Sequence, residues 1–345
     1  MLSTERSGRN QKMKNNKRNE EMMRASIRPG LGGAEQTIVK EIPKPIPKEH
    51  QILIKVNHAL VSPTDCSMKK EDPLFARFLF SLFKSKNKVY GEMYTGVIEK
   101  LGSSVIGFEV NDEVYGTNMM KLGAYAEYIC VKDTTVIRKV PQGIKPEDVV
   151  TLIDGGITSL PFLRDKGEII ESQKVLIIGA SGSVGSMGVQ IAKHFKAHVT
   201  GVCSTENIDL VKSLGADQVI DYKVTDYTKQ DIKYDIIYDA VGKSTFSACK
   251  DILKDEGRYM TTVPTLSSLW KLIFKVNQPG KKNLTAATGL RKQSLKHQDL
   301  EYLERLLKEN IITPLIDSEY TLEEMPKALK RVDSGHKKGS VVIHI

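Results

Sequence analysis

The sequence is poor in cysteine, and this scarcity excludes two kinds of architecture. Its four cysteines, at positions 66, 130, 203 and 249, are far apart and form no C-x-x-C pair. Such spacing supports neither a disulfide framework nor a cysteine-based zinc cluster. The pattern fits a reducing compartment, and we expect the protein in the cytoplasm.

Long apolar runs are also missing. No stretch of about 18 uninterrupted apolar residues occurs, so no transmembrane segment is expected. The opening segment, MLSTERSGRNQKMKNNKRNEEMMR, lacks the apolar core and the cleavage site of a secretory signal.

The opening segment is instead strongly basic. Seven Lys or Arg against three Glu place +4 of the net charge of +9 within residues 1–24. Such a tail could bind nucleic acid or an anionic membrane, but it has neither interleaved aromatics nor a binding motif. We interpret residues 1–22 as a disordered, solvated tail, expect no nucleic-acid partner, and keep Met22 or Met23 as an alternative start.

The remaining sequence shows two different patterns of apolar residues. Short β-rich runs such as QILIKVNHALV and AYAEYICV indicate a strand-dense, barrel-like first domain. After Pro146, apolar runs alternate with helical stretches, which predicts an α/β fold with a doubly wound parallel sheet. A late helix, for which Thr321 and Glu324 form a capping pair, and the strand KKGSVVIHI indicate that the chain returns to the first domain. The expected division is 23–148 with 290–345, and 149–289.

The most informative segment is a glycine-rich turn after a buried strand. KVLII leads into Gly179, Ala180, Ser181, Gly182, Ser183, Val184 and Gly185, and a helix follows. This pattern is typical of a dinucleotide-binding turn with Ala180 at the first glycine position. Gly182 would let the backbone approach the pyrophosphate, and Gly185 would let helix and strand pack closely.

The next strand ends about 20 residues after this turn, where NAD-specific sites carry an acid. Cys203 stands at that end, and Ser204 and Thr205 follow. Two hydroxyls without a carboxylate predict a 2′-phosphate site and favour NADPH over NADH. The alternative is that both residues only cap the helix beginning near Asn207, and Glu206 counts against the phosphate.

The motifs together resemble the medium-chain dehydrogenase/reductase superfamily, in its zinc-independent quinone oxidoreductase-like and alkenal/enone reductase-like branch. The matching segments are NDEVYG (111–116), GAYAEYICV (123–131), GGITSLPFL (155–163), GASGSVGSMGVQIAKHF (179–195), CSTENIDLVKSLGADQVIDY (203–222), YDIIYDAVG (234–242) and GHKKGSVVI (335–343). The resemblance implies a Rossmann domain beside a GroES-like barrel domain, with the active site between them and a homodimeric assembly.

The resemblance also assigns residues to an NADPH site. It places residues 182–185 around the pyrophosphate, Ser204 and Tyr222 beside the 2′-phosphate, and Thr158 near the nicotinamide. Asn207 stands where some quinone reductases have a phosphate-binding Lys, and Lys337 and Lys338 supply charge instead. The full set of expected cofactor contacts is Thr158, Gly179, Ala180, Gly182, Ser183, Val184, Gly185, Ser204, Thr205, Asn207, Tyr222, Val241, Val263 and Lys338.

The zinc ligands of the alcohol dehydrogenase branch have no counterpart here. Their positions align with Ser62, with Glu92 and Met93, and with Asp154. Because zinc sites without imidazole or thiolate are unusual, we expect no metal. Without a Lewis acid, alcohol oxidation is disfavoured.

The remaining chemistry is hydride transfer to a lipophilic quinone or α,β-unsaturated carbonyl. Ser62, Tyr94 and Thr95 are the candidate catalytic groups, although local backbone bonding explains each hydroxyl equally well. The apolar stretches 74–83 and 266–276 are expected to shape substrate access, with a dimer contact, a membrane surface or core packing as alternatives. A non-enzymatic NADPH-binding protein and a zinc alcohol dehydrogenase are the competing hypotheses.

Overall fold

The computed structural model describes residues 21–28, 34–67, 89–119, 121–263, 282–285 and 291–345. The predictions for the tail at residues 1–20 and for the apolar stretches 74–83 and 266–276 lie outside these ranges. None of the helices formed by the described residues combines the length and apolar composition needed to cross a bilayer.

One part of the molecule is a six-stranded parallel sheet in the order β10-β9-β8-β11-β12-β13. Numbered by occurrence this order is 3-2-1-4-5-6, the Rossmann order, and it reverses direction between β8 and β11. The strands are β8 Lys174–Ile178, β9 His198–Cys203, β10 Gln218–Asp221, β11 Tyr234–Asp239, β12 Leu253–Thr261 and β13 Lys282–Thr285. The carboxyl end of β8 therefore lies at the switch point where such sheets bind ligands.

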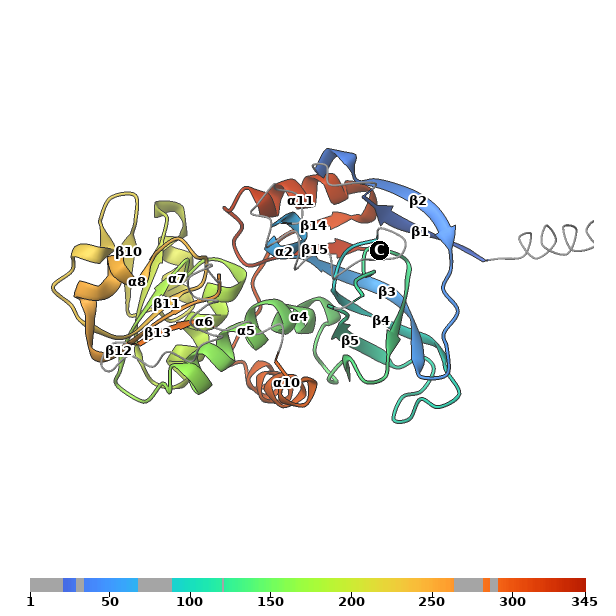
Figure 1. Cartoon of the computed structure of the whole chain (residues 1–345), viewed down its shortest axis with the longest axis horizontal. Coiled ribbons are helices and arrows are strands. Elements are labelled where there is room, and N and C mark those ends of the chain that lie inside the picture. Colours follow the sequence, from blue (N-terminus) through green and yellow to red (C-terminus); the bar gives the residue numbers. More distant parts are fainter. Residues whose placement is uncertain (1–20, 29–33, 68–88, 120, 264–281, 286–290) are drawn as a thin grey trace, which may run out of the picture.

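Helices cover both faces of this sheet (Figure 1). Val175 and Ile177 pack into a core cluster with α6 (Ser183–His194), whereas Leu176 and Ile178 belong to a second cluster that includes Cys249 of α8 (Phe246–Cys249). Successive strand residues face opposite sides, so a continuous apolar run is what a strand buried on both faces requires.

The other part is a seven-stranded sheet in the order β14-β15-β3-β4-β5-β7, with β6 paired to β3. Its strands are antiparallel except for the β14–β15 pair, which is parallel. They are β3 Gln51–Val61, β4 Met93–Leu101, β5 Glu113–Thr117, β6 Tyr128–Lys132, β7 Val136–Lys139, β14 Ile316–Thr321 and β15 Ser340–His344. The two sheets confirm the predicted combination of a doubly wound parallel sheet and a GroES-like β-domain.

The structure corrects one prediction from the sequence, the extent of the tail, and confirms another, the capping box. A separate ribbon of β1 (Met22–Ile27) and β2 (Ile38–Pro43) begins at Met22, within the segment interpreted as a tail. The predicted capping box is confirmed: Thr321 and Glu324 bond each other reciprocally before α11 (Met325–Asp333).

The two parts share one core. A single apolar cluster contains Leu60 and Val342 of the β-domain together with Val175 of the parallel sheet. Between them lie α4 (Pro146–Thr151), α5 (Ile157–Leu160) and α10 (Gln293–Lys308), as Figure 1 shows. On α10 the buried Glu304 accepts a 2.5 Å bond from the Tyr115 hydroxyl, which ties this helix to β5.

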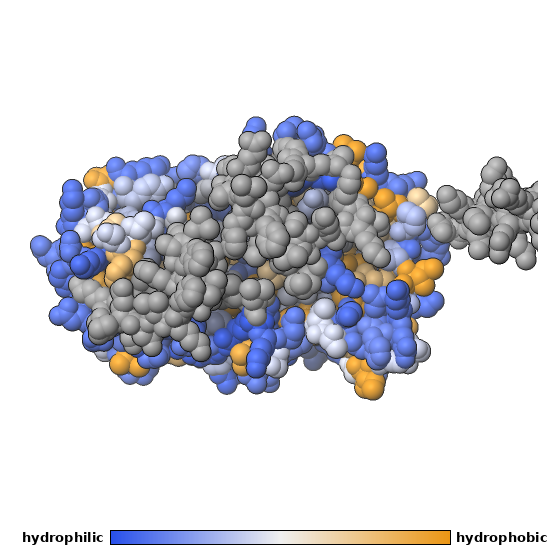
Figure 2. Space-filling model, viewed as in Figure 1, coloured by the Kyte–Doolittle hydropathy of each residue, from blue (hydrophilic) through white to orange (hydrophobic). Residues whose placement is uncertain are grey.

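The described surface in Figure 2 is mostly hydrophilic, and its apolar residues occur in small, separate groups. Exposed apolar side chains such as Ile46 and Ile106 are scattered singly along the chain. Singly exposed apolar residues of this kind are ordinary on protein surfaces.

Candidate cofactor and active site

The glycine-rich turn connects β8 to the first turn of α6. A Cβ at Gly185 would lie 2.1 Å from the carbonyl oxygen of Gly179, so helix and strand pack too closely for any other residue. A Cβ at Gly182 would meet only one protein atom, at 3.5 Å. The protein thus leaves space above Gly182, as expected where a pyrophosphate approaches the backbone and the helix N-terminus.

Two predicted cofactor contacts, Val241 after β11 and Val263 after β12, lie beside this turn. Gly179 has a φ of +79°, and a Cβ there would lie 2.5 Å from Val241 Cγ1. A Cβ at Gly242 would likewise lie 2.5 Å from Val263 Cγ2. Val241 and Val263 are both partly exposed, so they form an apolar edge next to the turn.

Sequence reasoning missed the residue that shapes this edge. The buried carboxylate of Asp239, at the end of β11, accepts bonds from the backbone N–H groups of residues 241, 242 and 244 and from the Tyr259 hydroxyl. An Asp that ends a buried strand was the available signal.

The segment carrying Thr158 packs on the same turn. A Cβ at Gly155 would lie 2.3 Å from the Ser183 carbonyl oxygen, and the Ser159 hydroxyl donates to the Val184 carbonyl oxygen at 2.8 Å. Thr158 is partly exposed, on the turn of α5 between these contacts. The residues on either side of Thr158 thus pack on Ser183 and Val184, whereas Ala180 of the turn is fully buried.

The tip of β9 brings together the residues expected at the adenosine ribose. Asn207 Nδ2 donates to the hydroxyl oxygens of Ser181 and Ser204, each at 3.1 Å. The Thr205 hydroxyl donates to Asp221 Oδ2 at 2.5 Å, and Lys223 Nζ lies 2.9 Å from Glu206 Oε2. Tyr222, half exposed, separates Asp221 from Lys223. The ion pair of Lys223 with Glu206 is a contact that sequence reasoning overlooked.

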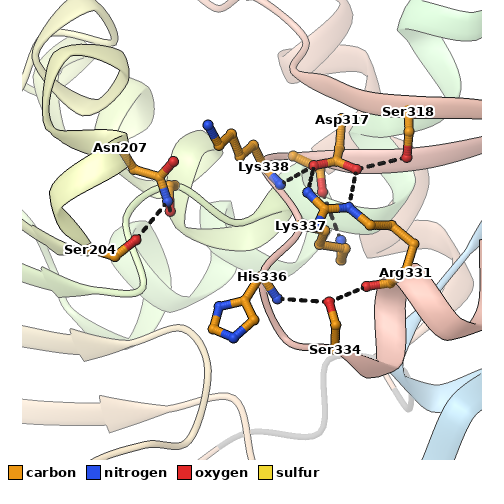
Figure 3. A network of polar contacts seen from close by, with 11 residues as sticks. Ser204, Asn207, Asp317, Ser318, Arg331, Ser334, His336, Lys337 and Lys338 are labelled. Carbon is orange, nitrogen blue, oxygen red and sulfur yellow. Dashed lines mark hydrogen bonds and ion pairs between the residues drawn. The ribbon is translucent and has the colours of Figure 1, made fainter.

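A loop from the β-domain closes over the turn (Figure 3). The N–H of Gly339 donates to the Ser181 carbonyl oxygen at 3.0 Å, and Lys337 Nζ donates to Ser183 Oγ at 2.8 Å. Asp317 anchors the loop by accepting the Lys338 N–H at 2.6 Å and by pairing with Arg331. In Figure 3 the Lys338 side chain extends toward the segment of Ser204 and Asn207.

Ser62 forms a compact buried motif with Asp65. Its hydroxyl and its backbone N–H donate to Asp65 Oδ2 at 2.8 and 2.9 Å, and the Tyr125 hydroxyl donates to the same oxygen at 2.8 Å. Burial raises the pKa of Asp65, although these bonds and the charge of Arg28 oppose the rise. Because the only proton of the Ser62 hydroxyl points to Asp65, Ser62 can accept a bond from a ligand but not donate one. The Ser-x-x-Asp spacing was the sequence signal for this motif.

The structure does not bring Tyr94 or Thr95 to Ser62. Tyr94 is fully buried in the β-domain core, and its hydroxyl has no hydrogen-bond partner. Burial raises the pKa of Tyr94 far above its ordinary value. Thr95, on the opposite face of β4, is equally buried, and its hydroxyl lies 3.0 Å from His58 Nδ1.

The positions of the zinc ligands hold a cluster of buried charge. Burial raises the pKa of Glu92 to about 8, and the carboxylates of Asp65 and Asp154 add to this rise, while Lys296 opposes it. Asp154 Oδ2 lies 3.8 Å from Lys337 Nζ. Burial also lowers the pKa of Lys296.

This donor set does not fit zinc. It offers a hydroxyl already bonded to a carboxylate, two carboxylates, and a lysine amine where a second cation would be repelled. Across the described ranges, no group of three or more His, Cys, Asp or Glu side chains could hold a metal ion.

Two family profiles and several known proteins match this chain. The profile of the alcohol dehydrogenase GroES-like domain matches residues 48–142, and that of the zinc-binding dehydrogenase family matches residues 214–343. A chloroplast envelope quinone oxidoreductase homolog of Arabidopsis thaliana is 27% identical, with 90% of this chain and 95% of that protein covered. The 2-methylene-furan-3-one reductase of Solanum lycopersicum is 30% identical over 86% of this chain and 72% of its own length. The solved quinone oxidoreductase of Coxiella burnetii superposes with a TM-score of 0.82 at 25% identity, covering 94% of this chain and all of that one.

Proposed function

Because the chain belongs to the medium-chain dehydrogenase/reductase superfamily, in its quinone oxidoreductase-like branch, we propose that it transfers hydride from NADPH to a quinone or an α,β-unsaturated carbonyl without zinc. It is an NAD(P)H-dependent oxidoreductase. The quinone and furanone acceptors named for two relatives motivate the choice of substrate class.

One observation carries the zinc-independent part of the proposal. Asp154 stands at a zinc-ligand position, and Lys337 Nζ lies 3.8 Å from its carboxylate. A lysine at this distance brings a positive charge to the Asp154 carboxylate, but an ammonium group cannot coordinate an alcohol oxygen as a Lewis acid does. Alcohol ionisation therefore has no support in this site, whereas reduction of an already electrophilic carbon needs none.

The nicotinamide, when bound, supplies the hydride. We propose that the residues of this chain hold and orient it: the space at Gly182 receives the pyrophosphate, and Thr158 lies on α5, whose neighbouring Ser159 bonds to the Val184 carbonyl oxygen of the turn. Val241 and Val263 border the turn with apolar surface. Orientation of both reactants is the main rate contribution that such a site can make.

Reduction of an enone or quinone also needs a proton for the resulting oxyanion. Ser62 cannot donate it, because Asp65 already accepts its hydroxyl proton. Burial and the neighbouring carboxylates of Asp65 and Asp154 raise the pKa of Glu92 to about 8, and this residue stands at the same aligned ligand positions as Ser62 and Asp154. We propose Glu92 as the candidate donor to this oxyanion, with solvent as the source of the proton.

A panel assay tests this function. NADPH oxidation is followed with quinones, 2-alkenals and cyclic enones, with saturated alcohols and NADP⁺ as the control reaction, in the presence and absence of a chelator. We expect turnover of at least one quinone or enone, unchanged by chelator, and no alcohol oxidation. Tight NADPH binding without turnover of any acceptor would favour a non-enzymatic cofactor-binding protein, and stoichiometric zinc with chelator-sensitive alcohol oxidation would favour a zinc dehydrogenase.

The remaining expectations stay proposals of the same kind. We propose a division into a β-domain of residues 23–148 and 290–345 and a cofactor domain of residues 149–289, a homodimeric assembly, and a cytoplasmic location. Size-exclusion chromatography with light scattering checks the assembly directly.

A further inference from the structure

The cofactor site contains an ion pair at the tip of β9 that the hydride-transfer function does not explain. Lys223 Nζ lies 2.9 Å from Glu206 Oε2, and both side chains are about half exposed. Glu206 comes directly after Ser204 and Thr205, where the adenosine ribose lies in a Rossmann site. A bond from its own backbone N–H, and further bonds from Lys223 and Ser204, lower the pKa of Glu206 to about 2.

At this position the negative charge of Glu206 would repel a 2′-phosphate. Glu206 and Asp221 are two carboxylates beside the expected phosphate position, and either would repel it. The Thr205 hydroxyl is committed to Asp221 at 2.5 Å, so it does not offer its proton to a ligand. Hydroxyls alone therefore cannot give the site a preference for phosphate.

Among the described residues, Lys223 is the cation best placed to solve this problem. Its backbone N–H is held by Asp221 Oδ1 at 2.9 Å, which fixes its Cα beside the ribose site. Its side chain is long, 48% exposed, and bound to a single carboxylate, so it can turn toward a ligand without breaking the fold.

The other nearby lysines are less suitable. Lys337 Nζ is occupied by Ser183 Oγ and the Gly339 carbonyl oxygen, each at 2.8 Å, at the pyrophosphate end of the site. Lys338 comes from the loop of the β-domain, and in Figure 3 its side chain extends toward the segment of Ser204 and Asn207. Lys223 differs in that it is paired with Glu206, the carboxylate that opposes a phosphate at this site.

We propose that the Glu206–Lys223 ion pair sets the choice of cofactor: Lys223 neutralises Glu206 and binds the 2′-phosphate of NADPH, and without Lys223 the exposed Glu206 carboxylate favours the ribose hydroxyls of NADH. This inference rests on the proposed NADPH-dependent function and names the residue that would produce its selectivity. The phosphate takes over as the partner of Lys223, and Glu206 retains its bonds from the backbone and from Ser204.

Two nucleotide fragments isolate this subsite from hydride transfer. Adenosine 2′,5′-bisphosphate carries the 2′-phosphate and 5′-AMP lacks it, and calorimetry gives the Kd of each for the full-length chain. The variants are Lys223→Ala and Glu206→Gln. The matched control is Lys254→Ala, because Lys254 forms an ion pair with Asp235 near the amino end of β11, whereas the ribose site lies at the carboxyl ends of the strands.

We expect Lys223→Ala to weaken the bisphosphate about tenfold or more, the usual size of a lost bond to a charged group, and to change 5′-AMP less than about twofold. Glu206→Gln should strengthen the bisphosphate severalfold, since one repulsive charge is removed. Lys254→Ala should leave both Kd values unchanged.

The role of Lys223, the preference for NADPH and the reductase function would each be contradicted by a different result. If the unmodified chain prefers the bisphosphate and Lys223→Ala keeps that preference, the role of Lys223 is wrong while the NADPH preference stands. If the unmodified chain binds both fragments equally, the NADPH preference fails and this inference fails with it. Absence of turnover with every acceptor contradicts only the reductase function, because the fragment measurements do not involve hydride transfer.

Discussion

Lys337 Nζ donates a 2.8 Å hydrogen bond to Ser183 Oγ, which joins a loop of the β-domain to the first residue of α6 in the cofactor domain. The same amine is 3.8 Å from the buried Asp154 carboxylate, and the neighbouring Gly339 bonds to the Ser181 carbonyl oxygen. Two of these contacts hold the glycine-rich turn against the β-domain, and the third joins the same loop to the segment of Asp154.

Lys337→Ala is expected to weaken NADPH and NADH binding to a similar degree, because Lys337 lies at the pyrophosphate end that the two cofactors share. It should also cost ~2 kcal/mol of unfolding free energy, since Asp154 is left buried without a cation. Adding Asp154→Asn should restore most of the stability but not the affinity. Fluorescence titration and urea unfolding measure the two effects, and selective loss of NADPH alone would contradict this role.

Gly182→Ala and Gly185→Ala are expected to separate binding from folding. A Cβ at residue 185 would lie 2.1 Å from a backbone oxygen, so this change should cost ~2 kcal/mol or more in stability. A Cβ at residue 182 would meet only one protein atom, at 3.5 Å, so the fold should persist while cofactor affinity falls about tenfold or more. Thermal unfolding and cofactor titration of both variants check this contrast, and equal destabilisation by the two would refute it.

Glu92→Gln is expected to flatten the pH dependence of stability. In the folded chain the pKa of Glu92 is raised to about 8, above the value of about 4.3 for an unfolded Glu, so the folded state binds the extra proton. The stabilising effect of that proton is full at low pH and is lost as the pH rises through 8. The unmodified chain should lose ~3 kcal/mol more between pH 5 and pH 8.5 than the variant does. Urea unfolding across this range measures the difference, with Glu109→Gln at an exposed position as control.

Tyr94→Phe is expected to leave kcat unchanged and to keep or slightly raise stability. The Tyr94 hydroxyl is buried without a partner, so its removal relieves a desolvated polar group worth ~1 kcal/mol. Steady-state kinetics with the best acceptor of the panel provides the measurement. A fall in kcat of about a hundredfold would instead return Tyr94 to the catalytic groups.

Ser204→Asp is expected to raise the KM for NADPH at least tenfold more than that for NADH, since an added carboxylate at the end of β9 repels a 2′-phosphate and accepts ribose hydroxyls. Ser204→Ala is the neutral comparison. Equal changes for the two cofactors would remove Ser204 from the phosphate site.

Much of the fold could be read from local patterns. The run from Val175 to Ile178 is apolar at every position, which is what a strand buried on both faces demands, and Thr321 with Glu324 marked a helix start that the structure confirms. The early strand β1 was missed because MMRASI directly follows a charged segment, and because its partners, β2 and residues 89 and 126, are distant in sequence.

The sequence alone determined the chemistry that is available: a glycine turn shaped for a dinucleotide, and no thiolate or imidazole at the zinc-ligand positions. These properties depend on residue type and local spacing, which the chain carries with it. Only the tertiary structure decided which groups meet. The Tyr94 hydroxyl points into the β-domain core because adjacent strand residues face opposite sides, and Lys223 pairs with Glu206 because parallel strands align their carboxyl ends. Contacts between residues distant in sequence follow from packing and cannot be read from either segment by itself.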